Sequence, residues 1–204
     1  MGLILNGNAP SKMLYNGAEV SLYFNGSKIW PTKANLPPYT LRLRFADGVI
    51  PTNSKGTLTQ VSSSPNVWDW TYDGSWWQAW EKYDTLLEVI DGNTSNVTAM
   101  AYLFNGCTSL TSVPLFDTSS VTNMAYLFND CTSLTSVPLF DTSKVSNTYN
   151  MLNNCYKVAS GALALYQQVS SQTTQPYHYQ MFRNCGRDTI TGAAELAQIP
   201  SGWK

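Results

Sequence analysis

The sequence predicts a mixed α/β solenoid of about five units of about 24 residues, preceded by a small all-β hairpin module and a β cap. The first observation behind this prediction is a near-perfect internal repeat: residues 97–120 and 121–144 match at 21 of 24 positions. The second is that each unit joins a short apolar strand phrase to a run with helical spacing. The third is a set of Asn-Gly steps near the start, which favour tight β-hairpin turns.

The repeat continues beyond the two matching copies. Cys155 follows Cys131 at the same period, and Cys185 follows thirty residues later, so this unit carries a six-residue insertion. In the other direction, Leu86 and Val89 match the corresponding positions of the first copy. We therefore expect the solenoid to span residues 73–204, with units that share one continuous core.

One unit has a clear local pattern. The phrase Leu110-x-x-Val113-x-Leu115 suits a short strand with its apolar side chains directed into the solenoid. The following Asp-Thr-Ser turn is typical of a helix start. Apolar residues then recur at nearly helical spacing over about two turns, at Val121, Met124, Leu127 and Phe128.

Two recurring phrases carry a resemblance to a known family. They are Asp117-Thr-Ser-Ser-Val-Thr-Asn-Met124 and Phe128-Asn-Asp-Cys-Thr-Ser-Leu-Thr-Ser-Val137. In these phrases the chain resembles the BspA-like leucine-rich-repeat family over residues 86–204, most strongly over 86–158. The resemblance implies a leucine-rich-repeat solenoid and a surface or adhesion-type protein without catalytic activity.

Residues 1–32 form a separate β module in this prediction. Asn-Gly steps at 6–7, 16–17 and 25–26 alternate with strand-forming segments, which predicts hairpins used for docking or oligomerisation. The segment Tyr15–Trp30 resembles the opening module of bacteriophage virion structural proteins. That resemblance implies contact with other virion proteins through residues 1–32.

Residues 33–72 are expected to form a linker and a β cap. A proline-containing stretch from Pro31 to Pro38 predicts an extended linker. Strict alternation over Thr40–Phe45 predicts a half-buried strand, and Thr57–Val61 and Val67–Tyr72 are further strand candidates. At the other end, Ala193–Ala197 predicts a short helix.

Composition excludes several classes of function. Charged residues are 12% of the chain, about half of the usual ~25%, while Ser, Thr and Asn together make 59 of 204 residues. A nucleic-acid-binding protein would need a basic patch, so no nucleic-acid partner is expected. The sequence has no long apolar run and no secretory leader, which predicts no membrane insertion and synthesis in a host cytoplasm.

Catalytic and metal chemistry have little support. His178 is the single histidine, and no nucleophile elbow or oxyanion loop accompanies it. Four cysteines share one position in successive units, which predicts a ladder of buried thiols rather than a zinc site: Cys107, Cys131, Cys155 and Cys185. Asp117 and Asp141 also repeat, and either bind turn N–H groups or, less simply, calcium. We expect no enzyme activity, cofactor or metal.

Aromatic residues are the best candidates for a ligand or partner surface. Six lie within a short segment and either form the core of the β cap, stack on sugar rings or contact another subunit; the five singled out as candidates are Trp68, Trp70, Tyr72, Trp76 and Trp77. Tyr102 and Tyr126 share one repeat position and, if exposed, make a short tyrosine ladder.

These observations lead to one functional prediction. We expect a non-enzymatic bacteriophage virion structural protein (capsid decoration, head fibre or tail-associated) that forms a homo-oligomer. Its repeat domain would project from the particle to contact a glycan or protein at the host surface. The alternative is an adhesin-type leucine-rich-repeat protein at a bacterial cell surface.

Overall fold

The structure is a computed structural model of the 204-residue chain. It describes side chains and backbone for most of the chain after residue 35, and the backbone alone for four short strands before it. The described ranges are 14–15, 18–19, 22–24, 27–30, 36–52, 55–72, 74, 76 and 84–204.

The four N-terminal strands form two antiparallel pairs. β1 (Leu14–Tyr15) pairs with β2 (Ala18–Glu19), and β3 (Leu22–Phe24) pairs with β4 (Ser27–Trp30). Each pair flanks one of the predicted Asn-Gly steps, at 16–17 and 25–26. The remaining step at 6–7 lies outside the described residues.

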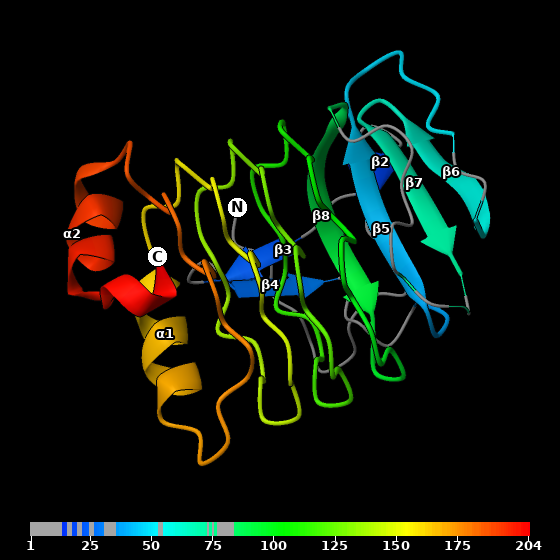
Figure 1. The fold of residues 1–204 in the computed structure, drawn as a ribbon. Coiled ribbons are helices and arrows are strands. Elements are labelled where there is room, and N and C mark those ends of the chain that lie inside the picture. The colour runs from blue at the N-terminus through cyan, green and yellow to red at the C-terminus, as the bar shows by residue number, and fades with distance from the viewer. Residues whose placement is uncertain are drawn as a thin grey trace.

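A four-stranded antiparallel sheet begins the main body (Figure 1). Its strands are β5 (Thr40–Phe45), β6 (Thr57–Ser63), β7 (Asn66–Thr71) and β8 (Leu86–Asn93). The strand order is β6-β7-β5-β8. The strand predicted from alternation and the two further strand candidates are therefore present. β8, which was predicted as part of the first repeat, completes the sheet.

The central strand β5 shows why this segment becomes a strand. Its alternate residues Leu41, Leu43 and Phe45 are buried in the core. Between them, Arg42 and Arg44 face the other side and make cross-strand ion pairs. Arg42 Nε lies 2.8 Å from Asp69 Oδ1, and Arg44 Nε lies 3.0 Å from Glu88 Oε2. One face of the sheet is thus apolar and packs on the repeats, while the other is polar.

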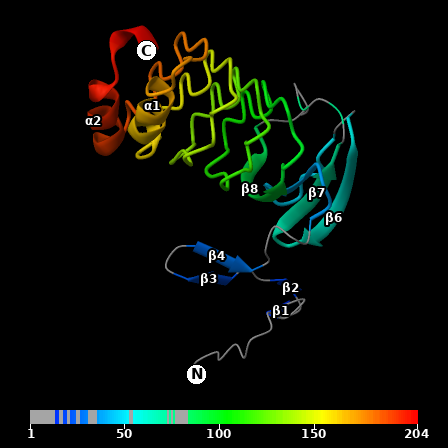
Figure 2. The same ribbon diagram turned by 90° about the horizontal axis from the view of Figure 1, so that it is seen from below.

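After β8 the chain winds into coils that stack on one another along a single direction (Figures 1 and 2). Parallel bridges join equivalent residues of successive coils, such as Ala99 with Asn123 and Asn123 with Asn147. The backbone N–H groups of Met124 and Tyr126 donate to the carbonyl oxygens of Asn147 and Tyr149 in the next coil, at 2.9 and 2.8 Å. Backbone hydrogen bonds between coils therefore hold the stack together.

The predicted mixed α/β solenoid of about five units is wrong. The fold is mostly β, and in the described part of the chain the only α-helices are α1 (Ala162–Ser170) and α2 (Ile190–Gln198), both near the C-terminus. The segment from Val121 to Phe128, predicted as a helix, contains no helix: it has a bridge residue at Asn123 and turns from Ala125 onward.

The backbone explains why no helix forms there. Tyr126 and Asp130 have positive φ angles of 57° and 60°, a left-handed conformation that interrupts a right-handed helix. Alternate N–H groups donate to the next coil, and those between them, such as Leu127 N to Met124 O at 3.2 Å, close four-residue β-turns within their own coil. Apolar spacing near three residues therefore marks successive turns rather than helical turns.

The predicted inward strand phrase is only partly correct. Leu110 is fully buried, but Leu115 is 54% exposed and its repeat equivalent Leu139 is 52% exposed. The neighbouring Phe116 and Phe140 occupy the core instead, with ring centroids 5.9 Å apart and nearly parallel planes. In each Val-Pro-Leu-Phe phrase, the leucine after the proline is exposed and the following phenylalanine is buried. The burial in this phrase therefore does not follow the alternation expected of a strand.

The two helices and the C-terminus close the far end of the stack. α1 follows Gly161, whose φ of 97° and close approach to the Val137 carbonyl leave no room for a side chain. α2 begins at an N-cap, Thr189, whose side chain accepts a hydrogen bond from Gly192 N. A short 3₁₀ helix, Ser201–Trp203, follows, and Trp203 is buried.

Candidate functional site

Two of the predicted aromatic candidates belong to the core. Trp70 and Trp76 are fully buried, with ring centroids 5.2 Å apart. Their indole N–H groups donate to the carbonyl oxygens of Lys55 and Tyr72, both at 2.7 Å. Because a buried indole needs such a partner, these residues seal the sheet against the repeats and are not a ligand surface.

The other aromatic candidates of the cap are Trp68, Tyr72 and Trp77. Trp68 and Tyr72 are half-buried and pack against the core, and Trp68 donates its indole N–H to Asn66 Oδ1 at 2.8 Å. Trp77 lies outside the described residues. The two described residues, Trp68 and Tyr72, therefore do not form an exposed patch.

The predicted tyrosine ladder is present and longer than the sequence indicated. The rings of Tyr102 and Tyr126 stack with centroids 4.4 Å apart and planes at 16°. Tyr149 meets Tyr126 edge-on at 5.0 Å, and it stacks against both Tyr177 and Tyr179. We call these five residues the tyrosine row.

Local structure fixes the row in place. Tyr102 and Tyr126 occupy the left-handed position of their turns, with φ angles of 61° and 57°. In the third coil the aromatic residue moves one position earlier, to Tyr149, whose N–H donates to Asn147 Oδ1 at 3.0 Å. This shift hid Tyr149 from a comparison at a strict period of 24, and the six-residue insertion hid Tyr177 and Tyr179.

The row becomes more exposed toward the C-terminal coil. Tyr102, Tyr126 and Tyr149 are half-buried, whereas Tyr177 is 61% and Tyr179 51% exposed. Since stacked rings turn their faces to one another, the first members of the row present mainly ring edges and hydroxyl groups. Hydrogen bonding with Tyr126 and the nearby charge of its phenolate form raise the pKa of Tyr149.

The first three coils of the row are almost uncharged, whereas the fourth coil carries His178 between Tyr177 and Tyr179, and Arg183. Among residues 97–107, 121–131 and 145–155, the only ionisable side chains besides tyrosine and cysteine belong to Asp130. An asparagine ladder runs through the same turns: Asn129 Nδ2 donates to Asn105 Oδ1 at 2.8 Å, and Asn153 Nδ2 donates to Asn129 Oδ1 at 3.0 Å. This ladder ties successive coils together and holds the turns in register.

The four cysteines form a second ladder, inside the core. All four are free and buried: Cys107, Cys131, Cys155 and Cys185. The thiols of Cys131 and Cys155 lie 3.1 and 3.0 Å from the carbonyl oxygens of Phe104 and Phe128 in the preceding coil. Burial raises the pKa of each thiol, that of Cys185 to about 12.

The repeated aspartates act on the backbone of their turns. Asp117 Oδ1 accepts from Ser119 N at 3.2 Å, and Asp141 Oδ1 accepts from Ser143 N at 2.9 Å. These bonds form Asx turns, which is the simpler of the two roles that the sequence left open. No group of three or more His, Cys, Asp or Glu side chains suited to a metal ion occurs among the described residues.

Comparison with known proteins yields one family. No curated protein and no solved structure matches this chain. Among the described residues, no helix has the length and apolar character needed to cross a membrane. One family model covers residues 77–189, more than half of the chain, which therefore belongs to the family described as "Mycoplasma protein of unknown function, DUF285".

Proposed function

We propose that this protein is a non-enzymatic structural protein whose stacked coils present a contact surface to a protein or glycan partner. The single observation that supports this most strongly is the tyrosine row. Five tyrosine side chains from four successive coils lie in contact, with Tyr177 and Tyr179 both stacked on Tyr149. Repeat proteins commonly use such extended surfaces for binding.

The chemistry of the row suits molecular contact. Tyrosine offers a large contact area with few rotatable bonds, and its hydroxyl group both donates and accepts hydrogen bonds. Stacking on neighbours restricts the rings further, so less conformational entropy is lost when a partner binds. Tyr177 and Tyr179, the most exposed members, are the residues on which we expect a partner to rest most directly.

The N-terminal hairpins support a docking role in this proposal. Two antiparallel pairs around Asn-Gly steps make a small module ahead of the main sheet, and an isolated two-stranded hairpin is marginal in water. We propose that this module docks onto other proteins of a bacteriophage virion, with the coils projecting toward the host, and that the protein assembles as a homo-oligomer.

A second placement is supported by the family. The matching family carries a description that names a cellular bacterium, and the repeat phrases resemble the BspA-like leucine-rich-repeat proteins. Both favour an adhesin-type protein at a bacterial cell surface as the alternative. The tyrosine row would serve as the contact surface in either placement.

The contact role is tested by truncating the row. The double variant Tyr177→Ala/Tyr179→Ala removes the two most exposed rings of the row. The control variant, Tyr156→Ala, removes a half-buried tyrosine outside the row. The guanidinium carbon of Arg187 lies 4.1 Å from the centroid of this ring. We expect the double variant to lose retention of the full chain on intact host cells, and Tyr156→Ala to keep it. Equal retention of both variants would refute the role of the row.

The placement is tested separately. Mass spectrometry of density-purified phage particles should detect peptides of this chain. Antibody labelling under the electron microscope should then locate the protein on the particle. Detection on protease-shaved bacterial cells, with none in particles, would favour the adhesin alternative instead.

A further inference from the structure

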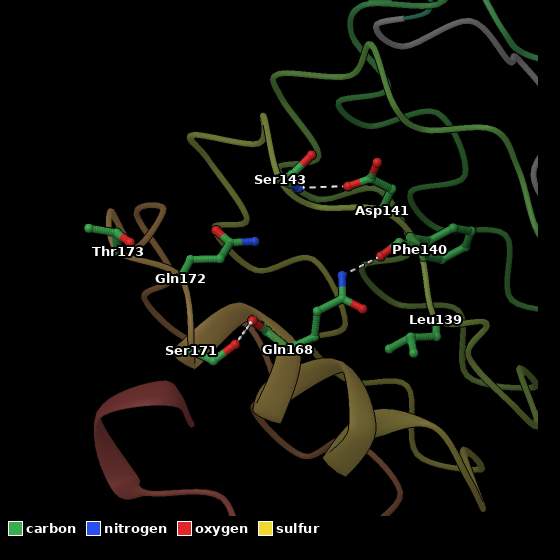
Figure 3. Close-up of a pocket in the computed structure, with 8 residues that line it drawn as sticks. All are labelled: Leu139, Phe140, Asp141, Ser143, Gln168, Ser171, Gln172 and Thr173. Carbon is green, nitrogen blue, oxygen red and sulfur yellow. Dashed lines mark hydrogen bonds between the residues drawn. The ribbon is translucent and has the colours of Figure 1, made fainter.

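A cavity of about 560 Å³ lies between one coil and the end of helix α1 (Figure 3). It is separate in its residues from the tyrosine row. One wall is the coil segment Leu139–Ser143, and the other is formed by α1 and the loop that follows it. Its lining residues are Leu139, Phe140, Asp141, Ser143, Gln168, Ser171, Gln172 and Thr173.

The helical wall is held against the coil by two glutamines. Gln168 Nε2 donates to Phe140 O at 2.6 Å, and Gln172 Nε2 donates to Thr142 O at 3.0 Å. Both amides also contact the hydroxyl of Thr142, which is fully buried. In the preceding coil the equivalent Thr118 hydroxyl donates to Asp141 O of the next coil at 2.8 Å. The glutamines therefore take the place of a further coil, and a fixed wall results.

The turn that forms the coil wall of the cavity recurs one repeat earlier in the chain, where it does not line the cavity. The Asp117–Ser119 turn repeats the Asp141–Ser143 turn 24 residues earlier, with the same hydrogen bond from serine N–H to aspartate Oδ1. Leu115 likewise repeats Leu139, and both are about half exposed. No residue of the earlier turn lines this cavity. The earlier turn is therefore a matched comparison within the same chain.

The lining offers many neutral polar groups and one charge. Ser143, Ser171 and Thr173 contribute hydroxyl groups, and the two glutamines contribute amides. Asp141 is the only ionisable side chain in the lining. Hydrogen bonds from the Ser143 N–H and hydroxyl, with a smaller effect of the Lys144 charge, lower the pKa of Asp141, so its carboxylate is ionised at neutral pH.

This combination matches one class of ligand. The Asp141 carboxylate and the side-chain amide oxygens of Gln168 and Gln172 can accept hydrogen bonds from sugar hydroxyl groups, whereas the glutamine N–H groups are already bonded to the coil. The serine and threonine hydroxyls can both donate and accept, and Leu139 offers an apolar edge for C–H groups. The volume lies within the range of about 300–1,000 Å³ typical of small-molecule sites. An anionic ligand would face the carboxylate. We propose that this cavity binds a neutral sugar residue of a glycan.

The test uses the full chain and a panel of methyl glycosides of glucose, galactose, mannose and N-acetylglucosamine. Binding is measured by saturation-transfer NMR and by titration calorimetry. Ser143→Trp places a large ring in the cavity, and Ser119→Trp places the same ring on the matched turn. We expect at least one glycoside to bind the wild type and Ser119→Trp equally, with binding to Ser143→Trp at least about tenfold weaker.

A second pair tests the carboxylate without removing the turn. Asp141→Asn keeps the oxygen that accepts the Ser143 N–H but removes the charge, and Asp117→Asn is its matched control. We expect Asp141→Asn to weaken glycoside binding by about tenfold, because hydrogen bonds to charged acceptors are stronger than those to neutral ones. Asp117→Asn should have no effect. Circular dichroism melting curves check that each variant is folded.

Three results would overturn the proposal. One is no saturation transfer to any of the four glycosides with the folded wild type. Another is binding that Ser143→Trp leaves unchanged. The third is preferential binding of charged probes, methyl glucuronide or glucosamine, over the neutral panel. None of these results bears on the tyrosine row, whose variants are tested on cells, so the two proposals fail independently.

Discussion

The imidazole of His178 lies parallel to the indole of Trp203, with ring centroids 3.6 Å apart and planes at 9°. Trp203 is the penultimate residue, and its carbonyl oxygen accepts the N–H of Phe182 at 2.9 Å. The end of the chain is thereby fixed onto the last coil. His178 Nδ1 is buried without a hydrogen-bond partner in the structure.

This contact predicts a pH-dependent stability. Burial lowers the pKa of His178 below its usual value, so between the lowered folded pKa and the unfolded value of about 6.5 the unfolded chain binds more protons. The free energy of unfolding is then highest above about pH 6.5 and falls as the pH is lowered through that window. Urea unfolding at pH 7.5, 6.0 and 5.0 measures this fall.

The matched variant is His178→Phe, which keeps a flat ring over Trp203 but cannot be protonated. We expect it to lose most of the fall in stability between pH 7.5 and 5.0. Carboxylates contribute equally to both proteins and cancel in the comparison. An identical pH dependence in the two proteins would show that His178 is not responsible.

Replacing an asparagine of the ladder by alanine should lower the free energy of unfolding by an amount that depends on its position in the ladder. Asn129 is buried and bonded on both sides, to Asn105 and Asn153, and it also donates to Asp130 Oδ2 at 2.7 Å. Asn129→Ala leaves the buried Asn153 amide without its acceptor, so we expect a loss of about 3 kcal/mol. Asn105→Ala, at the half-buried end of the ladder, should cost about 1 kcal/mol. Urea denaturation of the two variants checks this order, and equal losses would contradict it.

The sequence predicted the repeat, the ladder of cysteines and the strands of the cap, because each depends on periodicity. It failed on the fold class, because successive β-turns closed by hydrogen bonds between residues three apart give an apolar spacing similar to that of helical turns. Only the backbone shows the difference: Tyr126 takes a left-handed conformation that a helix excludes. Asparagine and aspartate tolerate that conformation, and Asp130, Asn150 and Asn154 were the available hints.

Only two members of the tyrosine row, Tyr102 and Tyr126, were predicted, because the prediction relied on a strict repeat period. Matching at a period of 24 joined Tyr102 to Tyr126, but Tyr149 is shifted by one position and Tyr177 belongs to the unit with the insertion. Side chains from neighbouring repeat positions meet when coils stack, which a comparison by columns does not show. The cavity beside α1 depends on a helix replacing a coil, and nothing in the periodicity indicates it.

The contact between Tyr126 and Tyr149 predicts a measurable titration. Because the hydroxyl and charge of Tyr126 raise the pKa of Tyr149, Tyr126→Phe should lower it toward the usual value of about 10. NMR of protein carrying ¹³C-labelled tyrosine, followed from pH 8 to 12, resolves the Tyr149 signal. Tyr156→Phe serves as the control and should leave that pKa unchanged; an unaltered Tyr149 titration in Tyr126→Phe would show that the two hydroxyls do not interact.

The cysteine ladder predicts thiols that report on unfolding. Burial raises the pKa of all four, and the thiolate is the reactive form, so both access and ionisation oppose modification. We expect no labelling of the native protein by a bulky aromatic disulfide at pH 8, and four labels per chain after denaturation.

The contact between His178 and Trp203 predicts which of the four thiols becomes accessible first. Cys185 belongs to the last coil, whereas Cys107 lies three repeat positions earlier in the chain and is fully buried. Trp203→Ala removes the ring that covers His178, so we expect Cys185 to be labelled faster than Cys107 in this variant, because loss of the end contact promotes opening of the last coil first. Peptide mapping after partial labelling identifies the modified thiol. Rapid labelling of any of the four in the folded wild type would refute the buried ladder, and simultaneous labelling of Cys185 and Cys107 in Trp203→Ala would show that the stack opens as one unit.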